Sequence, residues 1–232
     1  MGIELTEFCN RSCWYCPNSQ RQTPKIFITE DVLACFIERI KEIHWTGMVS
    51  YNGYGEPLIV PRLLDYIAKV TREVPRAFFC IFTNGDYLTG DQARTLFEAG
   101  IHHIMVTRHP PFSDNWDQRI NEVHHQFPQT ITVRTLRQDQ IKNAAGLLDF
   151  KAAPFSRCYV PSVGLTVCVD GSLRFCCADY NKEYLVGNIK NKSIKELWYD
   201  ERFKKIRRNL LFGKADLPVC RRCMSGGNKP NA

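Results

Sequence analysis

Short apolar runs alternate with segments of helical periodicity along roughly the first two thirds of the chain. The apolar runs predict strands at residues 3–8, 48–53, 77–85, 101–107 and 130–136. Between them, apolar positions three and four residues apart predict helices at residues 29–45, after Pro61, at 89–99 and at 114–127. Regular alternation of this kind gives parallel strands joined by right-handed crossovers. We therefore expect an α/β fold, a partial (open) βα barrel of about five to six units, too few to close an eight-stranded barrel.

The pattern changes near residue 151. Residues 163–177 have the pattern of two short strands around Asp170-Gly171, which is a typical hairpin turn. Ser193 and Glu196 have the spacing of a capping box, which predicts a helix that continues to about residue 211. We therefore expect a barrel core, a small C-terminal domain of a β-hairpin plus helix, and a disordered polar tail, at residues 1–150, 151–223 and 224–232.

Four loops that carry polar or reactive residues follow predicted strands. In parallel sheets the functional loops lie at the carboxyl ends of the strands. We therefore expect these four loops to converge on one mouth: the first cysteine cluster at 9–16, "GYGEP" at 53–57, "TNGD" at 83–86 and "TRHP" at 107–110.

The composition of the chain indicates its cellular compartment and the kinds of partner to expect. The 232 residues include eleven cysteines and carry a net charge of +7. No apolar stretch is long enough to span a bilayer and no signal peptide is recognisable, so we expect a cytoplasmic protein and no membrane partner. In a reducing compartment, clustered cysteines favour metal or redox ligands over disulfides. The basic residues at 204–208 lack interleaved aromatic residues, so a solvated helix face is expected and no nucleic-acid partner.

The first cysteine cluster has the spacing C-x₃-C-x₂-C, formed by Cys9, Cys13 and Cys16. Zinc usually takes four ligands, and this loop supplies three. Three thiolates on a four-iron cluster leave one iron open to bind a small molecule. An iron–sulfur cluster is therefore favoured, and a three-cysteine zinc loop is the alternative.

This spacing, with Tyr15 before the third cysteine, resembles the signature of the radical S-adenosylmethionine superfamily. The resemblance implies a four-iron cluster on the three cysteines, bound S-adenosylmethionine, and a flavodoxin- or ferredoxin-type electron donor. "GYGEP" looks like the family's Gly-Gly-Glu motif, in which the glutamate receives the methionine amine, and "TNG" ends a strand where the family places ribose or carboxylate contacts. The cofactor-binding residues implied are Tyr15, Gly53, Gly55, Glu56, Thr83 and Asn84.

The late cysteines resemble the twitch module, the half-length form of the SPASM domain. The spacing runs from Cys158 through Gly171 to Cys176 and ends with Cys220-x₂-Cys223. The resemblance implies a second, auxiliary four-iron cluster held by Cys158, Cys176, Cys220 and Cys223. No cysteine follows Cys223, so we expect one auxiliary cluster and two four-iron clusters in all. Cys177 is a rival to Cys176 as ligand, and a structural Cys₄ zinc site is the alternative to iron.

Segments along nearly the whole chain are similar to family members that oxidise aminocyclitols. This implies oxidation of a secondary alcohol of a small amino-sugar or cyclitol-like molecule to a ketone in natural-product biosynthesis, with the auxiliary cluster as electron acceptor. Such relatives carry an Asn-Arg-Gly-Gly stretch whose arginine can face substrate, whereas this chain reads Asn143-Ala144-Ala145-Gly146. The candidate replacements are Arg108, His109, Arg134 and Arg137.

Three other functions remain open. A radical epimerase would need a thiol that returns a hydrogen atom, and Cys168 is the spare candidate. A peptide-modifying enzyme of this type often has an N-terminal peptide-binding domain, for which we expect no room before the first strand. A nonenzymatic iron–sulfur or zinc binding module is the third alternative.

Overall fold

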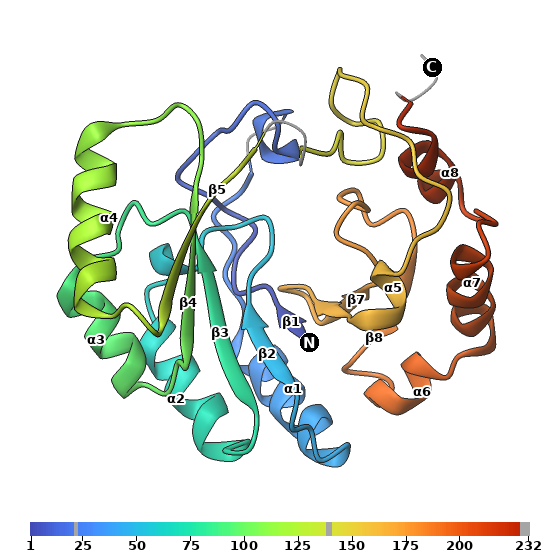
Figure 1. Cartoon of the computed structure of the whole chain (residues 1–232). Coiled ribbons are helices and arrows are strands. Elements are labelled where there is room, and N and C mark those ends of the chain that lie inside the picture. The colour runs from blue at the N-terminus through green and yellow to red at the C-terminus, as the bar shows by residue number, and fades with distance from the viewer. Residues whose placement is uncertain (21–22, 138–140, 228–232) are drawn as a thin grey trace.

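The computed structural model describes residues 1–20, 23–137 and 141–227. Its centre is an eight-stranded sheet in the order β5-β4-β3-β2-β1-β6-β7-β8, open at both edges (Figure 1). The strands are β1 (Gly2–Ile3), β2 (Met48–Tyr51), β3 (Phe78–Thr83), β4 (His103–Arg108), β5 (Ile131–Thr135), β6 (Thr166–Val167), β7 (Ser172–Arg174) and β8 (Leu185–Asn188).

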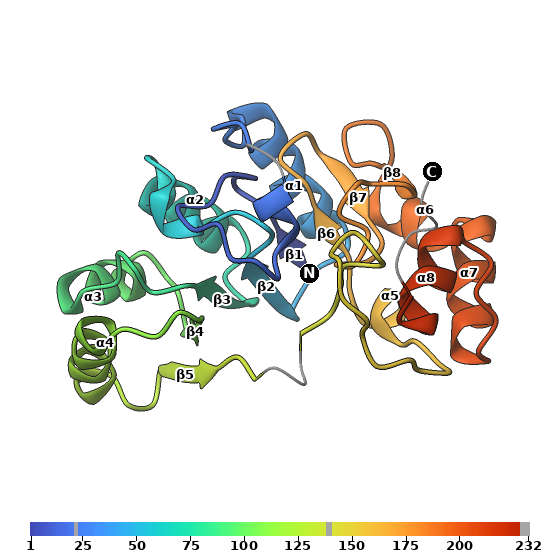
Figure 2. The same ribbon diagram turned by 90° about the horizontal axis from the view of Figure 1, so that it is seen from above.

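The first five strands pair in parallel, each with the next along the chain. The helices that connect them lie on one side of the curved row of strands (Figure 2). They are α1 (Glu30–Glu42), α2 (Leu63–Glu73), α3 (Gly90–Glu98) and α4 (Asp114–Gln126), with short 3₁₀ helices η1 (Pro17–Gln20) and η2 (Pro57–Ile59). The expected α/β fold with an open, unclosed sheet is therefore confirmed, with five parallel strands joined by four helices in this part of the chain.

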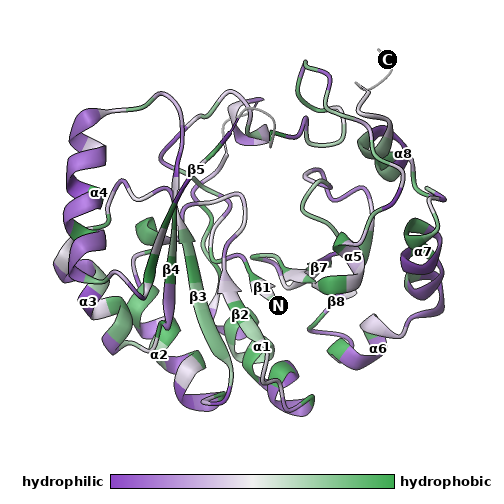
Figure 3. Cartoon of the chain, in the orientation of Figure 1, coloured by the Kyte–Doolittle hydropathy of each residue, from purple (hydrophilic) through white to green (hydrophobic). Residues whose placement is uncertain are grey.

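The helices pack on the sheet through the apolar positions that predicted them. Leu33, Phe36 and Ile40 of α1 and Ile67 and Val70 of α2 are completely buried. Burying one such side chain stabilises the fold by about 1.5–3 kcal/mol. The opposite sides of these helices are polar (Figure 3), so the pattern fixes which face of each helix meets the sheet.

The C-terminal hairpin continues the same sheet across residue 150. Strand β6 pairs in parallel with β1, with Gly2 opposite Thr166 and Ile3 opposite Val167. Strands β6 and β7 then pair antiparallel around Asp170-Gly171, as predicted. This added pairing covers the edge of β1 that would otherwise expose unpaired backbone groups.

The predicted helix from Ser193 to about residue 211 is wrong in one respect, because it is two helices, α6 (Ile194–Trp198) and α7 (Glu201–Leu211). The capping box of Ser193 and Glu196 is confirmed. The break arises because the Asp200 side chain accepts a hydrogen bond from the backbone N–H of Phe203, 3.0 Å away, and so begins a new helix.

Two further helices complete the fold, α5 (Val160–Val163) and α8 (Pro218–Ser225). Helix α8 carries Cys220 and Cys223 and ends at Gly226, which has φ +65°. The helix therefore reaches into the stretch expected to be a disordered tail, and residues 228–232 of that tail lie outside the described residues. In the described part of the chain, every helix is too short or too polar to span a bilayer.

Candidate active site

Cys9, Cys13 and Cys16 lie on the loop between β1 and η1, and all three are partly exposed. The loop is tightened by a hydrogen bond from the Cys16 N–H to the Cys13 carbonyl oxygen, 2.8 Å. The Arg11 N–H also points at the Cys9 sulfur, 3.4 Å away. Burial raises the pKa of Cys9 to about 11, so this thiol is neutral at pH 7 and must lose its proton when a metal binds.

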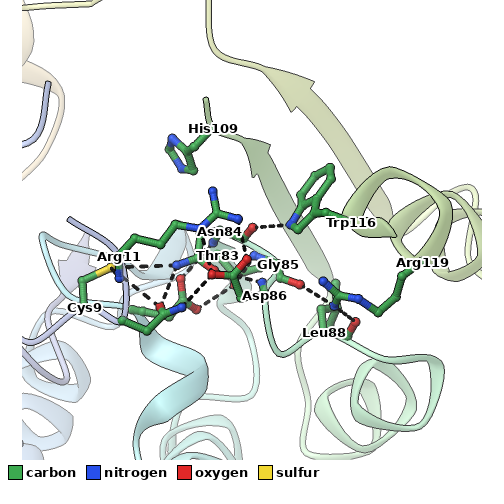
Figure 4. Close-up of polar contacts among 12 residues, drawn as sticks. Cys9, Arg11, Thr83, Asn84, Gly85, Asp86, Leu88, His109, Trp116 and Arg119 are labelled. Atoms are coloured by element: carbon green, nitrogen blue, oxygen red, sulfur yellow. Dashed lines mark hydrogen bonds and ion pairs between the residues drawn. The ribbon is translucent and has the colours of Figure 1, made fainter. Parts of the chain in front are cut away.

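The loop after β3 is joined directly to the cysteine loop (Figure 4). The Asn84 side-chain amide donates to Asn10 at 2.9 Å and lies 3.8 Å from the Cys9 sulfur. Arg11 donates to Asp86 in a two-pronged ion pair, with its Nε 2.7 Å from one carboxylate oxygen. Planar pairs of this kind fix orientation as well as position, so "TNGD" and the cysteine loop form one unit.

Helix α4 supports the same loop from the other side. The Trp116 indole donates to the Asn84 carbonyl oxygen at 3.0 Å, and Arg119 donates to the carbonyl oxygens of Gly85 and Leu88 at 2.8 and 2.9 Å (Figure 4). Gly85 has φ +75°, a conformation that favours glycine. The loop is therefore held by side chains far from it in the sequence.

Glu56 joins the "GYGEP" loop to the end of β3. Its carboxylate is buried, with 3% exposure, and accepts from the Thr83 hydroxyl at 2.7 Å, the Asn84 N–H at 2.8 Å and the Leu58 N–H at 3.1 Å. Burial raises the pKa of this carboxyl, while the three donors oppose the shift. A carboxylate has about four acceptor sites, so Glu56 keeps capacity for one further donor such as an ammonium group.

Gly55 is required because the backbone of the "GYGEP" loop passes close to the backbone at Thr6. A Cβ at this position would overlap the carbonyl oxygen of Thr6, in the segment after β1. The nearby Glu56 N–H donates to the Phe8 carbonyl oxygen at 3.0 Å. The glycine therefore lets the "GYGEP" loop lie directly against the chain that leads into the cysteines.

Tyr15 and His109 bring the fourth loop to the same place. The Tyr15 hydroxyl lies 2.6 Å from Nδ1 of His109, and the rings stack with centroids 6.0 Å apart. Burial, reinforced by the positive charges of Arg11 and Arg134, lowers the pKa of His109 to about 4. The imidazole is thus neutral at pH 7, and four strand-end loops do meet at one mouth.

The candidate arginines have other contacts. Arg108 pairs with Asp117 of α4 and lies 4.0 Å from the centroid of the Phe112 ring. Arg134 donates to the Thr107 hydroxyl at 3.1 Å, and Arg137 is exposed. His109 contacts the cysteine loop through Tyr15.

The Asn143–Gly146 segment forms a tight turn in which Ala144 and Ala145 have φ of 47° and 55°. Left-handed conformations are costly for residues other than glycine. Arg222 of α8 donates to the Ala145 carbonyl oxygen at 3.0 Å and pairs with Glu183. No local sequence signal marks Arg222, because its partners lie 39 and 77 positions away along the chain.

A second site lies in the C-terminal part. A small pocket is lined by Cys158, Cys176, Cys220 and Cys223, all four of the predicted auxiliary ligands. The other described residues in its wall are apolar: Phe155, Pro161, Phe175, Ala178, Leu210, Val219 and Met224. Cys177 is not among the described lining residues. Burial raises the pKa of Cys220 to about 12 and of Cys223 to about 11.

The two cysteine sets can be compared with the ligand requirements of zinc and of an iron–sulfur cluster. Within the described residues, no three Cys, His, Asp or Glu side chains converge as ligands of a single ion. A zinc ion needs such convergence on one point, whereas a four-iron cluster takes one thiolate on each of its irons. Both sets consist of cysteine side chains alone, which are the donors that iron–sulfur clusters take, so the residues present fit such clusters.

Cys168, the spare thiol, follows β6 and has no exposed surface. Its backbone N–H donates to the Ser172 carbonyl oxygen within the hairpin, at 2.9 Å. Burial raises the pKa of this thiol. The structure therefore places Cys168 in the interior of the hairpin, away from solvent.

Two family models match the chain. Residues 3–146 match the radical SAM superfamily, and residues 158–224 match SPASM, an iron–sulfur cluster-binding domain. The chain is 31% identical over 229 residues to the S-adenosyl-L-methionine-dependent 2-deoxy-scyllo-inosamine dehydrogenase of Niallia circulans, which covers 95% of this chain and 90% of the relative. It is 28% identical over 107 residues to a tungsten-containing aldehyde ferredoxin oxidoreductase cofactor-modifying protein of Pyrococcus furiosus. That alignment covers 45% of this chain and 29% of the relative.

Solved structures of two proteins have a similar fold. The structure of BtrN in complex with AdoMet and 2-DOIA superposes with a TM-score of 0.88 at 29% identity, over 96% of this chain and 91% of that one. The structure of anSMEcpe with bound AdoMet and a peptide superposes with a TM-score of 0.67 over 99% and 91% of the two chains. Identity in the second case is 13%, so that likeness concerns the fold alone.

Proposed function

Because this chain belongs to the radical S-adenosylmethionine superfamily, we propose that it oxidises a secondary alcohol of a small amino-sugar or cyclitol-like molecule to a ketone. Family membership means that the chain binds S-adenosylmethionine and an iron–sulfur cluster. The observation that carries the dehydrogenase proposal is the second cysteine-lined pocket, because a cluster bound there could act as the electron acceptor of the oxidation.

The first cluster is assigned to Cys9, Cys13 and Cys16. Glu56 has the acceptor capacity for the methionine amine, and Gly55 allows the close approach of its loop. Tyr15, Gly53, Thr83 and Asn84 are assigned to the same binding site because they lie on the loops that meet there. S-adenosylmethionine bound in such a site supplies, after one-electron reduction, methionine and a 5′-deoxyadenosyl radical that takes a hydrogen atom from the substrate.

The second cluster is assigned to Cys158, Cys176, Cys220 and Cys223, which makes two four-iron clusters in all. Support comes from the shared apolar cavity and the match of residues 158–224 to an iron–sulfur cluster-binding domain. Four thiolates leave no iron open, so this site suits electron transfer rather than substrate binding. Formation of the ketone requires that the alcohol lose one hydrogen atom from its carbon, one proton from its oxygen and one electron. A cluster held by these four cysteines would accept that electron.

An epimerase is the weaker alternative. Epimerisation returns a hydrogen atom from a thiol, and Cys168 is buried inside the hairpin. A peptide substrate is likewise less favoured, because the relative that matches 95% of the chain is named for a small aminocyclitol.

The substrate-facing group is assigned to His109 in place of the arginine missing at Ala144. His109 is hydrogen-bonded to Tyr15 beside the cysteine loop, whereas Arg108 is paired with Asp117 on α4. A neutral imidazole can accept the alcohol proton. We further propose a flavodoxin- or ferredoxin-type electron donor and a cytoplasmic location. The net charge of +7 favours association with an acidic partner. The expected lack of a nucleic-acid partner stays a prediction.

The experiment uses anaerobically reconstituted protein with dithionite, S-adenosylmethionine and a panel of aminocyclitols, amino sugars, nucleosides and peptides. Each alcohol is deuterated at its carbinol carbon. We expect one aminocyclitol or amino sugar to give a ketone together with an equimolar amount of deuterated 5′-deoxyadenosine. Turnover of a peptide alone, or a substrate released with inverted configuration, would contradict the proposal.

A further inference from the structure

Tyr54 lies between the two cysteine sites. It is the second residue of "GYGEP", and its ring packs edge-on against Tyr180, with centroids 4.6 Å apart. Its hydroxyl donates to the carbonyl oxygen of Cys177, the residue after the auxiliary cysteine Cys176. One side chain of the first site therefore contacts the backbone beside a ligand of the second.

The backbone of Tyr54 is held on the opposite side. Its N–H donates to the Glu4 carboxylate at 2.7 Å, and its carbonyl oxygen accepts from the Asn18 amide at 3.0 Å. Asn18 is two residues after Cys16 and also donates to the Glu7 carbonyl oxygen at 3.2 Å. The position of the Tyr54 ring is thus fixed to the loop that carries the first cluster.

Two further contacts close the connection. The Tyr180 hydroxyl donates to the Asn18 side-chain oxygen at 2.8 Å. The Arg174 guanidinium lies 5.1 Å from the centroid of the Tyr54 ring and pairs with Glu4 at 3.1 Å. We define the Tyr54 bridge as Glu4, Asn18, Tyr54, Arg174 and Tyr180.

The bridge holds the segment around Cys176 from both sides. Arg174 precedes Cys176 by two residues and Tyr180 follows it by four. The Glu4–Arg174 and Asn18–Tyr180 contacts are buried, so they are shielded from water and resist reorientation. Tyr54 is partly exposed, and its hydroxyl meets the Cys177 carbonyl at the surface. The rate of electron transfer falls steeply with the distance between donor and acceptor, so a fixed spacing between the two sites bears directly on the reaction.

We propose that Tyr54 is a positioning residue that fixes the auxiliary cysteine segment against the S-adenosylmethionine-binding loop and so sets the yield of ketone per radical formed. The proposal rests on the proposed dehydrogenase function. It predicts that removal of the Tyr54 hydroxyl separates radical formation from oxidation, because the Cys177 carbonyl loses its donor while the backbone contacts of Tyr54 remain.

The test compares Tyr54→Phe with Tyr51→Phe. Tyr51 is a matched control, since it is a buried tyrosine three residues away whose hydroxyl has no hydrogen-bond partner among the described residues. Both variants are loaded with iron, and ketone and 5′-deoxyadenosine are measured in the same reactions. We expect the ratio of ketone to 5′-deoxyadenosine to fall by about five-fold in Tyr54→Phe, the effect of one lost hydrogen bond, and to stay at the wild-type value in Tyr51→Phe.

A second measurement does not depend on turnover. Amide hydrogen exchange of residues 174–184 in the iron-loaded protein should be faster in Tyr54→Phe and in Tyr180→Phe than in Tyr51→Phe. Tyr180→Phe keeps the "GYGEP" loop intact and replaces Tyr54→Phe if the latter fails to load iron. Wild-type coupling with unchanged exchange in the bridge variants would overturn the inference, whereas a wild-type protein that makes no ketone would overturn the proposed function instead.

Discussion

The carboxylate of Glu4 lies 3.1 Å from the guanidinium of Arg174, and both side chains are almost completely buried, with 1% and 4% exposure. These residues are 170 positions apart, one directly after β1 and the other at the end of β7. Glu4 also accepts from the Tyr54 N–H, so a single carboxylate joins the first strand, the "GYGEP" loop and the hairpin. The ion pair therefore connects the barrel core to the segment that leads into Cys176.

Replacement of Glu4 by Gln should destabilise the fold, because it leaves the Arg174 charge buried without a counter-charge. Removal of one partner from a buried pair costs about 3–5 kcal/mol. Urea unfolding of the metal-free protein measures this free energy. The control is Asp91→Asn, which breaks an exposed pair with Arg94 and should change stability by less than about 1 kcal/mol. Equal effects of the two substitutions would show that the Glu4–Arg174 pair is not structurally important.

Glu56→Gln should weaken S-adenosylmethionine binding by about ten-fold or more. The two Glu56 oxygens face donors on both sides, the Thr83 hydroxyl and the Asn84 N–H. An amide NH₂ in place of either oxygen would meet a donor and could no longer accept from the methionine amine. Anaerobic equilibrium dialysis measures the affinity. Unchanged affinity would mean that Glu56 only connects the two loops.

Cys176→Ser and Cys177→Ser should differ in iron content. Cys176 lines the apolar cavity with the other three predicted ligands, whereas Cys177 is exposed and is not among its described lining residues. Reconstituted Cys177→Ser should keep about eight irons per chain and Cys176→Ser should fall toward about four. The reverse result would assign Cys177 as the ligand. Zinc in this site of the wild type would remove the basis of the dehydrogenase proposal.

The stability of the metal-free protein should depend on pH through His109. Burial lowers the pKa of His109 to about 4, below its ordinary value of 6.5, so the unfolded chain binds the proton first as pH falls. The contribution of the neutral ring is therefore complete above pH 6.5 and is lost as pH falls from 6.5 to about 4. His109→Gln should show a shallower loss over this window in chemical unfolding. Parallel curves for wild type and variant would show that the ring is not held neutral by the fold.

The features that local patterns encode were predictable from the sequence. Strand–helix alternation predicted the open parallel sheet. The four residues that line one pocket, from Cys158 to Cys223, were implied by the resemblance to the twitch module and not by a local pattern. The N-cap at Asp200 is a local signal too, but it lies inside a continuous helical pattern that does not distinguish one helix from two. Contacts between distant segments, such as Tyr54 with Cys177 or Arg222 with Ala145, have no local signature and need the folded chain.

The ratio of ketone to 5′-deoxyadenosine in a variant without the auxiliary cluster tests the central claim most directly. Cys220→Ala combined with Cys223→Ala removes two thiols from the cavity and leaves Cys9, Cys13 and Cys16 unchanged. Circular dichroism first establishes that the variant is folded, because a cluster bound here would also stabilise this part of the chain. We predict that the variant still forms 5′-deoxyadenosine but yields little ketone, while the wild type forms the two in equal amounts. A folded variant that makes ketone and 5′-deoxyadenosine in equal amounts would contradict the assignment of the second cysteine site as the electron acceptor.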